Sequence, residues 1–560
     1  MAWNLNALYG GVNSDKFKSD MNLLKEKIDS LSLNINTIDF DAWNKTIADY
    51  QDILILSNKL KTYVGLFLLV EQGDKNAISA NHEIGFLENK IKQIEIKILY
   101  LCDDSVVRMF DNHEYKYFIE TLNEKRKHYA QSCQEEILSQ IPQFSSNSWV
   151  LLHKSNLNAI KPDGLSLAKT QSMQMGNDFE SRKQGYYHEL KIAEQASNVS
   201  SYAINGIKSE NILTAKVRNY DSVLDMCLQN DGLNVDLLNN FFKILDTILP
   251  QLRLCVRKKS GNDTIKWYNL LYSSPKNINF NLSPDEAITT VKKAFSDFSL
   301  YAENMINKAI ENSLIDHEPR ENKRNGACCD TVYDTKETYV MLTYAGSYKN
   351  FSSLAHELGH SYHHTLLNEN PYFYSSAPYP ISEMISTFFE MVVADSLKEQ
   401  YPQYSEYILE GIVSGMIITF MEVYSRYIFE NNLYKEKEKG FVSADVICNL
   451  MLDSQKQIYG ETNDPESYNP YNWVVKPHFY YTDVPYYNYS YIVGRLGSLY
   501  LFGRYKKKGS QFVSEFEDIL KKSGKQSTDS TLNQLGIKND DEFFSNTLKT
   551  LNSIINEYLA

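Results

Sequence analysis

His356-Glu357-Leu358-Gly359-His360 is the stretch of this 560-residue chain that says most about its fold and chemistry. The dipeptide His-Glu occurs five times, and only here does a second histidine follow four residues after the first. That spacing is about one turn of an α-helix, so both imidazoles lie on one helix face and can reach one metal ion. We therefore predict a helix here that carries a metal site.

The neighbouring residues suit such a helix. Phe351-Ser352-Ser353 offers an N-cap, and Leu354, Ala355 and Leu358 provide an apolar side. Glu357 follows the first histidine directly and can reach the open position of a zinc ion held by the two histidines. There it can act as the general base on a water molecule.

A zinc ion in a hydrolase usually has three protein ligands, so one more is needed besides His356 and His360. The extended metzincin pattern would need glycine at the position of His363 and histidine at that of Leu366, and it fails twice. His363 is only three residues from His360, so we expect it at most behind a ligand. We expect His364 to be a packing or surface residue.

A carboxylate from a second helix is the remaining source of a ligand. Glu383 and Glu390 stand seven residues apart, on one face of a predicted helix, with apolar residues between them. Burying two like charges is costly unless a cation or an imidazolium compensates them. We predict that Glu383 is the third ligand and that Glu390 hydrogen-bonds a ligand histidine from behind. The competing interpretation is a solvent-exposed acidic face.

Composition and charge narrow the class of protein. Apolar residues make up 43% of the chain and charged residues 23%, which is typical of a globular protein. Asp plus Glu number 70 against 57 for Lys plus Arg, a net charge of −13 that repels phosphate backbones and anionic lipids. We expect neither a nucleic acid nor a membrane as partner. The seven cysteines form no CxxC pair, and the N-terminus shows no secretion signal, so we expect reduced thiols and a cytoplasmic protein.

Helical periodicity dominates the rest of the chain. Amphipathic patterns cover residues 17–31, 43–70, 77–101 and 115–138, whereas the clearest strand pattern is 338–344. The uncharged apolar stretch 411–421 is shorter than the ~20 residues that span a bilayer, and it predicts a buried core helix. We place one division near residue 200, between an N-terminal helical lobe, 1–199, and a larger helical body, 200–560.

Four segments combine into a recognisable arrangement. After the HExGH pattern at 356–360, an ExxS pattern begins at Glu383, 23 residues beyond His360, and Glu390 follows it. Residues 323–327 match a KRxGA pattern, and 477–489 are rich in Tyr with one His. Together these segments resemble the M3 family of zinc metallopeptidases, of the oligoendopeptidase F type. The resemblance covers nearly the whole chain and makes 200–560 an M3-type catalytic region.

The resemblance implies a mostly α fold: a two-lobed helical body around a deep central channel, with a small β-sheet beside the HExxH helix. Segment 338–344 would be the edge strand of that sheet and would pair with the backbone of an extended peptide. Thr343, Tyr344, Ala345 and Gly346 would then contact the substrate. Substrates would be short peptides, because a folded protein cannot enter such a channel.

The implied activity is zinc-dependent hydrolysis of internal peptide bonds. His356, His360 and Glu383 would hold one Zn²⁺ per chain. Glu357 would take a proton from water and deliver it to the leaving amine.

The developing oxyanion needs further donors, and the segment 477–489 offers candidates. They are His478, Tyr481 and Tyr489, and the resemblance points most firmly to His478 and Tyr489. Tyr480 could take the place of Tyr481 after a one-residue shift. Tyr486 is expected to contact the substrate.

Two alternatives remain open. A carboxypeptidase or dipeptidyl carboxypeptidase could use the same scaffold, but it needs a cation that clamps the substrate's terminal carboxylate, for which Arg495 and Lys476 are candidates. A non-catalytic peptide-binding relative is the other alternative, although the ligands and the base are all present. Subsite preference and oligomeric state are not determined by the sequence.

Overall fold

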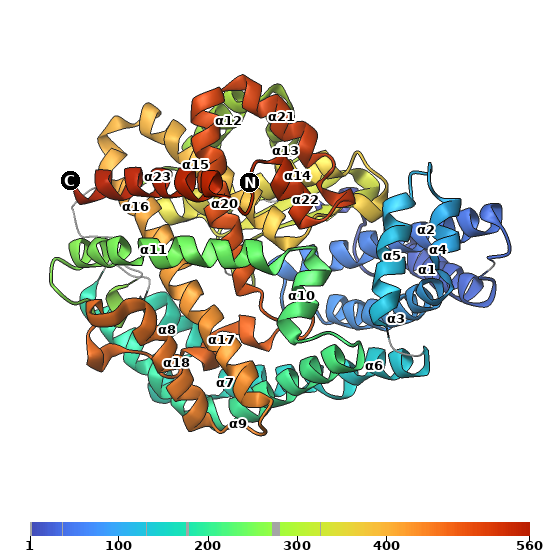
Figure 1. Ribbon diagram of the computed structural model, residues 1–560, viewed down its shortest axis with the longest axis horizontal. Coiled ribbons are helices and arrows are strands. Elements are labelled where there is room, and N and C mark those ends of the chain that lie inside the picture. The colour runs from blue at the N-terminus through green and yellow to red at the C-terminus, as the bar shows by residue number, and fades with distance from the viewer. Residues whose placement is uncertain (1–2, 36, 130–131, 175–177, 271–279, 325) are drawn as a thin grey trace. The chain divides into compact units, whose positions relative to one another are not determined.

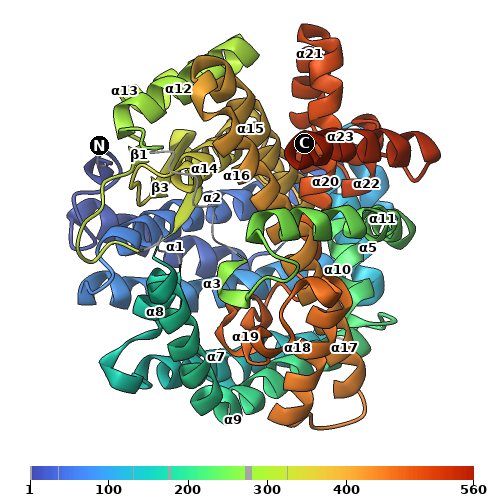
Figure 2. The same cartoon turned by 90° about the vertical axis from the view of Figure 1, so that its left-hand side faces the viewer.

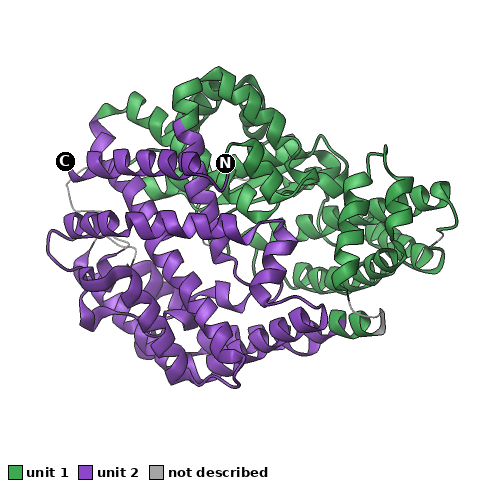
Figure 3. Cartoon of the chain, in the orientation of Figure 1, with its two compact units in different colours: residues 1–139, 280–402, 504–536 green, residues 140–279, 403–503, 537–560 purple. Residues whose placement is uncertain are grey.

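The computed structural model describes residues 3–35, 37–129, 132–174, 178–270, 280–324 and 326–560. Helices make up most of these described residues, and a single small sheet is found among them, so the predicted mostly α class is confirmed. Asn325, within the KRxGA pattern, lies outside the described residues. The chain divides into two compact units, coloured green and purple in Figure 3.

Unit 1 comprises residues 1–139, 280–402 and 504–536. Its N-terminal helices are α1 (Asp15–Leu33), α2 (Phe40–Val70), α3 (Lys75–Leu101), α4 (Asp104–Met109) and α5 (Lys116–His128). Its later elements are α12 (Pro284–Phe298), α13 (Leu300–Glu311), β1 (Ile315–Asp316), β2 (Ala327–Val332), β3 (Glu337–Leu342), α14 (Tyr348–Leu367), α15 (Tyr379–Gln400), α21 (Ser510–Leu520) and α22 (Thr528–Gln534), labelled in Figure 1.

Unit 2 comprises residues 140–279, 403–503 and 537–560. Its helices are α7 (Ser146–Ala159), α8 (Leu167–Gln174), α9 (Phe179–Val217), α10 (Val223–Asp231), α11 (Val235–Ser260), α16 (Ser405–Ile417), α17 (Tyr424–Lys437), α18 (Ala444–Tyr459), α19 (Asn472–Val475) and α23 (Asp541–Leu559). A π-helical turn, Ile418–Val423, joins α16 to α17. Helices α6 (Ser132–Phe144) and α20 (Asn488–Lys508) each begin in one unit and end in the other.

The sheet of unit 1 has the strand order β1-β3-β2. β1 pairs with β3 in parallel, with Ile315 opposite Val340, and β2 pairs with β3 in antiparallel fashion, with Ala327 opposite Leu342. β3 is therefore the central strand. The prediction that this strand forms the edge was wrong, because the pattern of apolar and β-branched residues marks a buried strand but does not give its neighbours.

Three of the four helical patterns predicted near the N-terminus form single helices in the structure. Patterns 17–31, 43–70 and 77–101 correspond to α1, α2 and α3. The pattern 115–138 is divided between α5 and α6, since the chain turns to an extended conformation at Tyr129, with φ −76° and ψ 137°. The described cysteine side chains, among them the neighbours Cys328 and Cys329, are free thiols as predicted.

Two helices are long and apolar enough to cross a bilayer by length and composition, Phe40–Val70 and the continuous stretch Pro402–Lys437. Core helices of globular proteins pass the same test. In its most apolar window, Pro402–Lys437 has 72% of its residues buried within the protein, against 39% for Phe40–Val70. The burial of Pro402–Lys437 agrees with the core helix predicted for 411–421.

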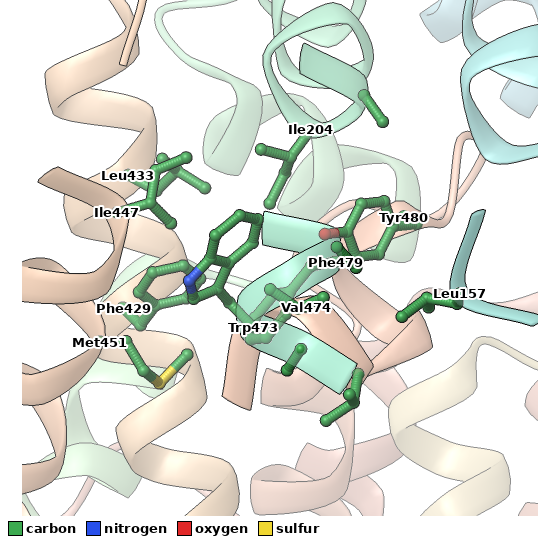
Figure 4. Packing of buried hydrophobic residues seen from close by; sticks show 14 of the residues in the cluster. Leu157, Ile204, Phe429, Leu433, Ile447, Met451, Trp473, Val474, Phe479 and Tyr480 are labelled. Atoms are coloured by element: carbon green, nitrogen blue, oxygen red, sulfur yellow. The ribbon is translucent and has the colours of Figure 1, made fainter. Parts of the chain in front are cut away.

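A large apolar cluster forms the core of unit 2. α9, α17, α18 and α19 contribute most of its side chains, and Figure 4 shows Trp473, Phe479 and Tyr480 packed within it. Tyr480 is 3% exposed, and its ring stacks on His153 with the centroids 3.7 Å apart. This residue is therefore a core residue of unit 2.

The predicted division near residue 200 does not coincide with any boundary between the two units. Residues 199 and 200 lie in the middle of α9, a continuous helix. Each unit is assembled from three separate stretches of chain. No change in composition marks such an arrangement, because contacts between distant stretches create the units.

Candidate metal centre and active site

The motif histidines stand on α14, which is longer than predicted. The helix begins at Tyr348, because the side chain of Ser347 accepts a hydrogen bond from the Asn350 backbone N–H at 3.2 Å and caps the helix. The predicted start at 351–353 was thus too late by about one turn. His356 and His360 share one face, with ring centroids 4.8 Å apart.

The opposite side of α14 holds the helix against the sheet. Leu354, Ala355 and Leu358 are at most 1% exposed. The Ser361 hydroxyl lies 3.0 Å from the hydroxyl of Thr338 on β3. Figure 2 shows β1, β3 and α14 close together.

α15 brings the predicted third ligand, and Gly359 sets how closely this helix approaches α14. A Cβ atom at Gly359 would lie 2.7 Å from the Cα of Ser386 and 3.1 Å from its carbonyl oxygen. The two helices therefore touch backbone to backbone at this point. Contact at Gly359 places Glu383, three residues before Ser386, beside the histidines.

His356, His360 and Glu383 form a group of three ligand atoms within 4.8 Å of one another. The Nε2 atom of His356 is 3.6 Å from Glu383 Oε2, and the Glu383 side chain is 8% exposed. The donor set of two imidazole nitrogens and one carboxylate oxygen is one that zinc favours in hydrolytic sites. The residues present therefore fit a metal ion of this type.

Each histidine is held by its other ring nitrogen. His356 Nδ1 donates to Glu390 Oε1 at 2.7 Å, and the Ser352 hydroxyl donates to Glu390 Oε2 at 3.2 Å. His360 Nδ1 lies 3.2 Å from the Ser382 hydroxyl oxygen. Both contacts leave Nε2 directed to the ligand group, which is how outer groups orient metal-binding histidines. The position predicted for Glu390 agrees with this geometry, whereas Ser382 and Ser352 were missed.

The electrostatics of the site favour a positive charge. Burial opposes protonation of His356, yet its hydrogen bond to Glu390 and the nearby carboxylates raise its pKa to about 9. For Glu357, burial raises the pKa to about 7, and the nearby carboxylates Glu383 and Glu390 contribute to this increase. Three carboxylates gathered around two imidazoles need a compensating cation.

His363 and His364 do not join the ligand group. His363 is 1% exposed, and its Nε2 lies 2.8 Å from the Ser523 hydroxyl. Burial lowers the pKa of His363 to about 3 and that of His364 to about 4. Both are packing residues inside unit 1.

The predicted substrate contacts after β3 are engaged within unit 1. Thr343 O accepts a hydrogen bond from the Asn350 amide, and Ala345 N donates to the same side chain. Tyr344 N donates to His317 O, and Gly346 O accepts from Leu282 N. β1 and β2 are both edge strands beside β3, and β2 is the longer of the two. The end of β2 lies along α2, where the Thr62 hydroxyl donates to Thr331 O at 3.5 Å.

The remaining predicted site residues belong to unit 2. His478 is partly exposed, and its ring lies 5.4 Å from that of Tyr481, which is 38% exposed. Of the two tyrosines 480 and 481, only Tyr481 thus accompanies His478. Burial, with nearby Arg426 and Lys476, lowers the pKa of His478 to about 4, so its imidazole is neutral at physiological pH.

Tyr486 and Tyr489 turn to the interior of unit 2. Tyr489 is 2% exposed and donates to Asp231 Oδ2 at 2.5 Å. Tyr486 is 3% exposed, and its hydroxyl donates to Asn431. Their roles as oxyanion donor and substrate contact stay predictions, and this geometry does not favour them.

Two tyrosines that the sequence analysis did not select accompany His478 instead. The rings of Tyr487 and Tyr491 each lie 6.0 Å from the His478 ring and 5.0 Å from each other. Both are partly exposed. Tyr491 stands in the first turn of α20 and Tyr487 just before it, and their spacing of four residues, about one helical turn, is the signal that could have identified them.

The profile of Peptidase family M3 matches residues 172–550, more than half of the chain. The chain belongs to peptidase family M3. The match includes every residue of the ligand group and the His478–Tyr491 segment, and it begins before the boundary predicted near residue 200.

Individual relatives of this M3 chain are distant. Oligopeptidase PepF of Bacillus subtilis is 23% identical over 440 residues, which cover 76% of this chain and 65% of that protein. Group B oligopeptidase PepB of Streptococcus agalactiae is 25% identical over 418 residues, 71% of this chain and 68% of that protein. The chain thus spans about two thirds of the length of these relatives. The solved oligoendopeptidase-F of Enterococcus faecium has the same fold, with a TM-score of 0.71 at 17% identity, covering 97% of this chain and 98% of that one.

Proposed function

We propose that this M3 family chain is a zinc-dependent endopeptidase that hydrolyses internal bonds of short peptides. The observation that carries the proposal is the group His356, His360 and Glu383, with its ligand atoms within 4.8 Å of one another and Glu357 next to it. The names of the related proteins, oligopeptidases and oligoendopeptidases, support peptides as substrates.

A zinc ion held by these three side chains would polarise the scissile carbonyl and make a water molecule easier to deprotonate. Glu357 accepts the proton of the attacking water and later delivers it to the leaving amine. Glu390 and Ser382 keep the imidazoles in the orientation that ligation needs.

For the oxyanion donors we propose His478 together with Tyr487 and Tyr491, in place of Tyr489. A donor must reach the substrate, and these two tyrosines are partly exposed beside His478, whereas Tyr489 donates to Asp231 in the interior. Tyr481 stays a candidate for a substrate contact. Likewise, we propose that the edge strand β2, not β3, pairs with an extended peptide backbone, because β3 has a neighbouring strand on both sides.

An exopeptidase would need a cation that binds the terminal carboxylate of the substrate. Neither of the two predicted candidates, Lys476 and Arg495, is available for this. Lys476 Nζ lies 3.1 Å from Glu422, which also binds Arg426, and Arg495 is 6% exposed. An internally quenched peptide, blocked at both ends, separates the two activities. Cleavage of this peptide supports an endopeptidase, and exclusive cleavage of free C-termini would reject it.

Glu357→Gln tests the mechanism most directly. We expect peptide cleavage to fall by at least ~10³-fold, because the proton acceptor is lost, while about one zinc ion per chain stays bound. Zinc content is measured by atomic emission and cleavage with the blocked peptide. Glu383→Ala is the matched control and should lose zinc itself. Retention of zinc in Glu383→Ala, or its loss in Glu357→Gln, would contradict these roles.

A further inference from the structure

The turn that leads into α20 contains a strained residue. Tyr486 has φ +59°, the left-handed region that bulky side chains rarely adopt. Such a conformation persists only where the surrounding structure holds it. Tyr487 follows it directly and Tyr491 stands five residues after it along the chain; these are the tyrosines beside His478.

A buried ion pair meets this turn. Lys208 on α9 donates to Glu430 Oε1 on α17 at 2.7 Å, and the two side chains are 1% and 0% exposed. The same oxygen of Glu430 accepts the backbone N–H of Tyr486 at 3.2 Å. Its other oxygen accepts the Asn488 amide at 3.4 Å. One carboxylate thus binds both sides of the turn.

Further contacts fix the same segment from neighbouring helices. The Tyr486 ring stacks on Tyr434 of α17, with centroids 5.0 Å apart, and its hydroxyl donates to Asn431. From α10, Asp231 accepts the Tyr489 hydroxyl, and the Cys227 thiol donates to Pro485 O at 3.3 Å. Residues 485–489 are thus held on their inner side by α17 and α10, and α9 acts on them through the pairing of Lys208 with Glu430.

The contacts on the inner side of this segment determine which of its side chains face outward. Tyr489 and Tyr491 lie on roughly opposite faces at the start of α20, and Tyr487 lies in the turn just before that helix. With Tyr489 anchored inward, Tyr487 and Tyr491 are brought to His478. A buried ion pair can specify one conformation of the chain rather than add stability.

We propose that Lys208 and Glu430 are positioning residues, whose ion pair holds the turn at Tyr486 and so keeps Tyr487 and Tyr491 beside His478. The proposal rests on the proposed peptidase function. It adds that catalysis depends on a charge pair that touches neither substrate nor metal. Removing the pair should therefore lower kcat without weakening peptide binding.

The test replaces the pair by neutral side chains of similar size, Lys208→Met with Glu430→Gln. Unit 2 offers a matched control in the pair Lys259 and Glu410, 3.6 Å apart with side chains 3% and 12% exposed, for which the same exchanges are Lys259→Met with Glu410→Gln. Contacts described for that pair lead to Ser414 and Tyr558, not to the turn. Thermal unfolding, kcat and KM for the blocked peptide, and hydrogen–deuterium exchange of residues 485–491 are measured for all three proteins.

We expect kcat of the Lys208/Glu430 variant to fall at least tenfold with KM within threefold, and its 485–491 segment to exchange faster. The control should lose a similar amount of thermal stability but keep kcat within twofold. Equal kcat in the two variants, or unchanged exchange at 485–491, would overturn the proposal. Should the Lys208/Glu430 variant not fold, Tyr486→Gly leaves the pair intact and frees the turn, and an unaltered kcat there would overturn it equally.

The exchange measurement needs no substrate, so it separates two kinds of failure. A wild-type chain that cleaves no peptide would reject the proposed function. Faster exchange confined to 485–491 in the Lys208/Glu430 variant would still show that this ion pair restrains the turn.

Discussion

Tyr489 and Tyr491 stand two residues apart on α20, and their surroundings differ completely. Tyr489 donates to Asp231 inside unit 2, while Tyr491 lies at the partly exposed ring cluster of His478. A phenol stabilises an oxyanion only if it can approach the scissile carbonyl oxygen. Exposure therefore favours Tyr491 over Tyr489, although both fit the composition of the segment.

Tyr491→Phe should lower kcat by ~10²–10³-fold with little change in KM, because the lost hydroxyl acts mainly in the transition state. Tyr489→Phe is the matched comparison and should have a much smaller effect, since its hydroxyl serves only to anchor the turn. Steady-state kinetics with the blocked peptide measure both. A larger loss for Tyr489→Phe would restore Tyr489 as the donor.

The pair α14 and α15 is the element on which the metal site depends. Its ligands come from both helices, so the distance between the helix axes sets the distance between imidazole and carboxylate. Gly359 and Ser386 meet at the closest approach, where a Cβ atom would come within 2.7 Å of backbone. The glycine of HExGH is thus a packing requirement of the metal centre.

Gly359→Ala should destabilise the protein by ~1–3 kcal/mol, because backbone atoms of α15 must move to admit the methyl group. The shift carries Glu383 with it, so zinc affinity should fall as well. Gly65→Ala on α2 is the control, since a Cβ there meets nothing within 4 Å, and it should be neutral or slightly stabilising. Thermal unfolding and competition with a chromophoric chelator measure the two effects. Unchanged zinc affinity in Gly359→Ala would contradict this reasoning.

The two compact units are interleaved in the sequence, because each one combines three separate stretches of the chain. Unit 1 joins residues 1–139 to 280–402 and 504–536, so the N-terminal helices and the metal helices share one compact body. α2 packs on β2, and Asn58 of α2 accepts the backbone N–H of Tyr333 at 3.1 Å. The catalytic region is therefore incomplete without the N-terminal helices.

The fragment 200–560 should consequently fail to fold as an independent unit, because it lacks α1–α5 and begins in the middle of α9. We expect little cooperative unfolding by calorimetry and no tight zinc binding. The full chain is the reference. Cooperative unfolding together with full-length zinc affinity would show that the N-terminal region is a separate domain after all.

The sequence by itself predicted the donor set of the candidate metal centre. Two histidines one turn apart and a carboxylate pair seven residues apart are local patterns, and local periodicity decides which side chains share a helix face. The N-terminal helices follow from the same rule. Glu390 could be predicted as well, because a ligand histidine needs an acceptor behind it.

Only the tertiary structure decided the rest. The central place of β3, the interleaved units and the inward turn of Tyr489 all depend on contacts between stretches far apart in the chain. Lys208, Glu430 and Tyr486 meet across more than 200 residues, and none of them stands out in its own segment. Periodicity says which face a residue occupies, but packing with distant segments decides what that face meets.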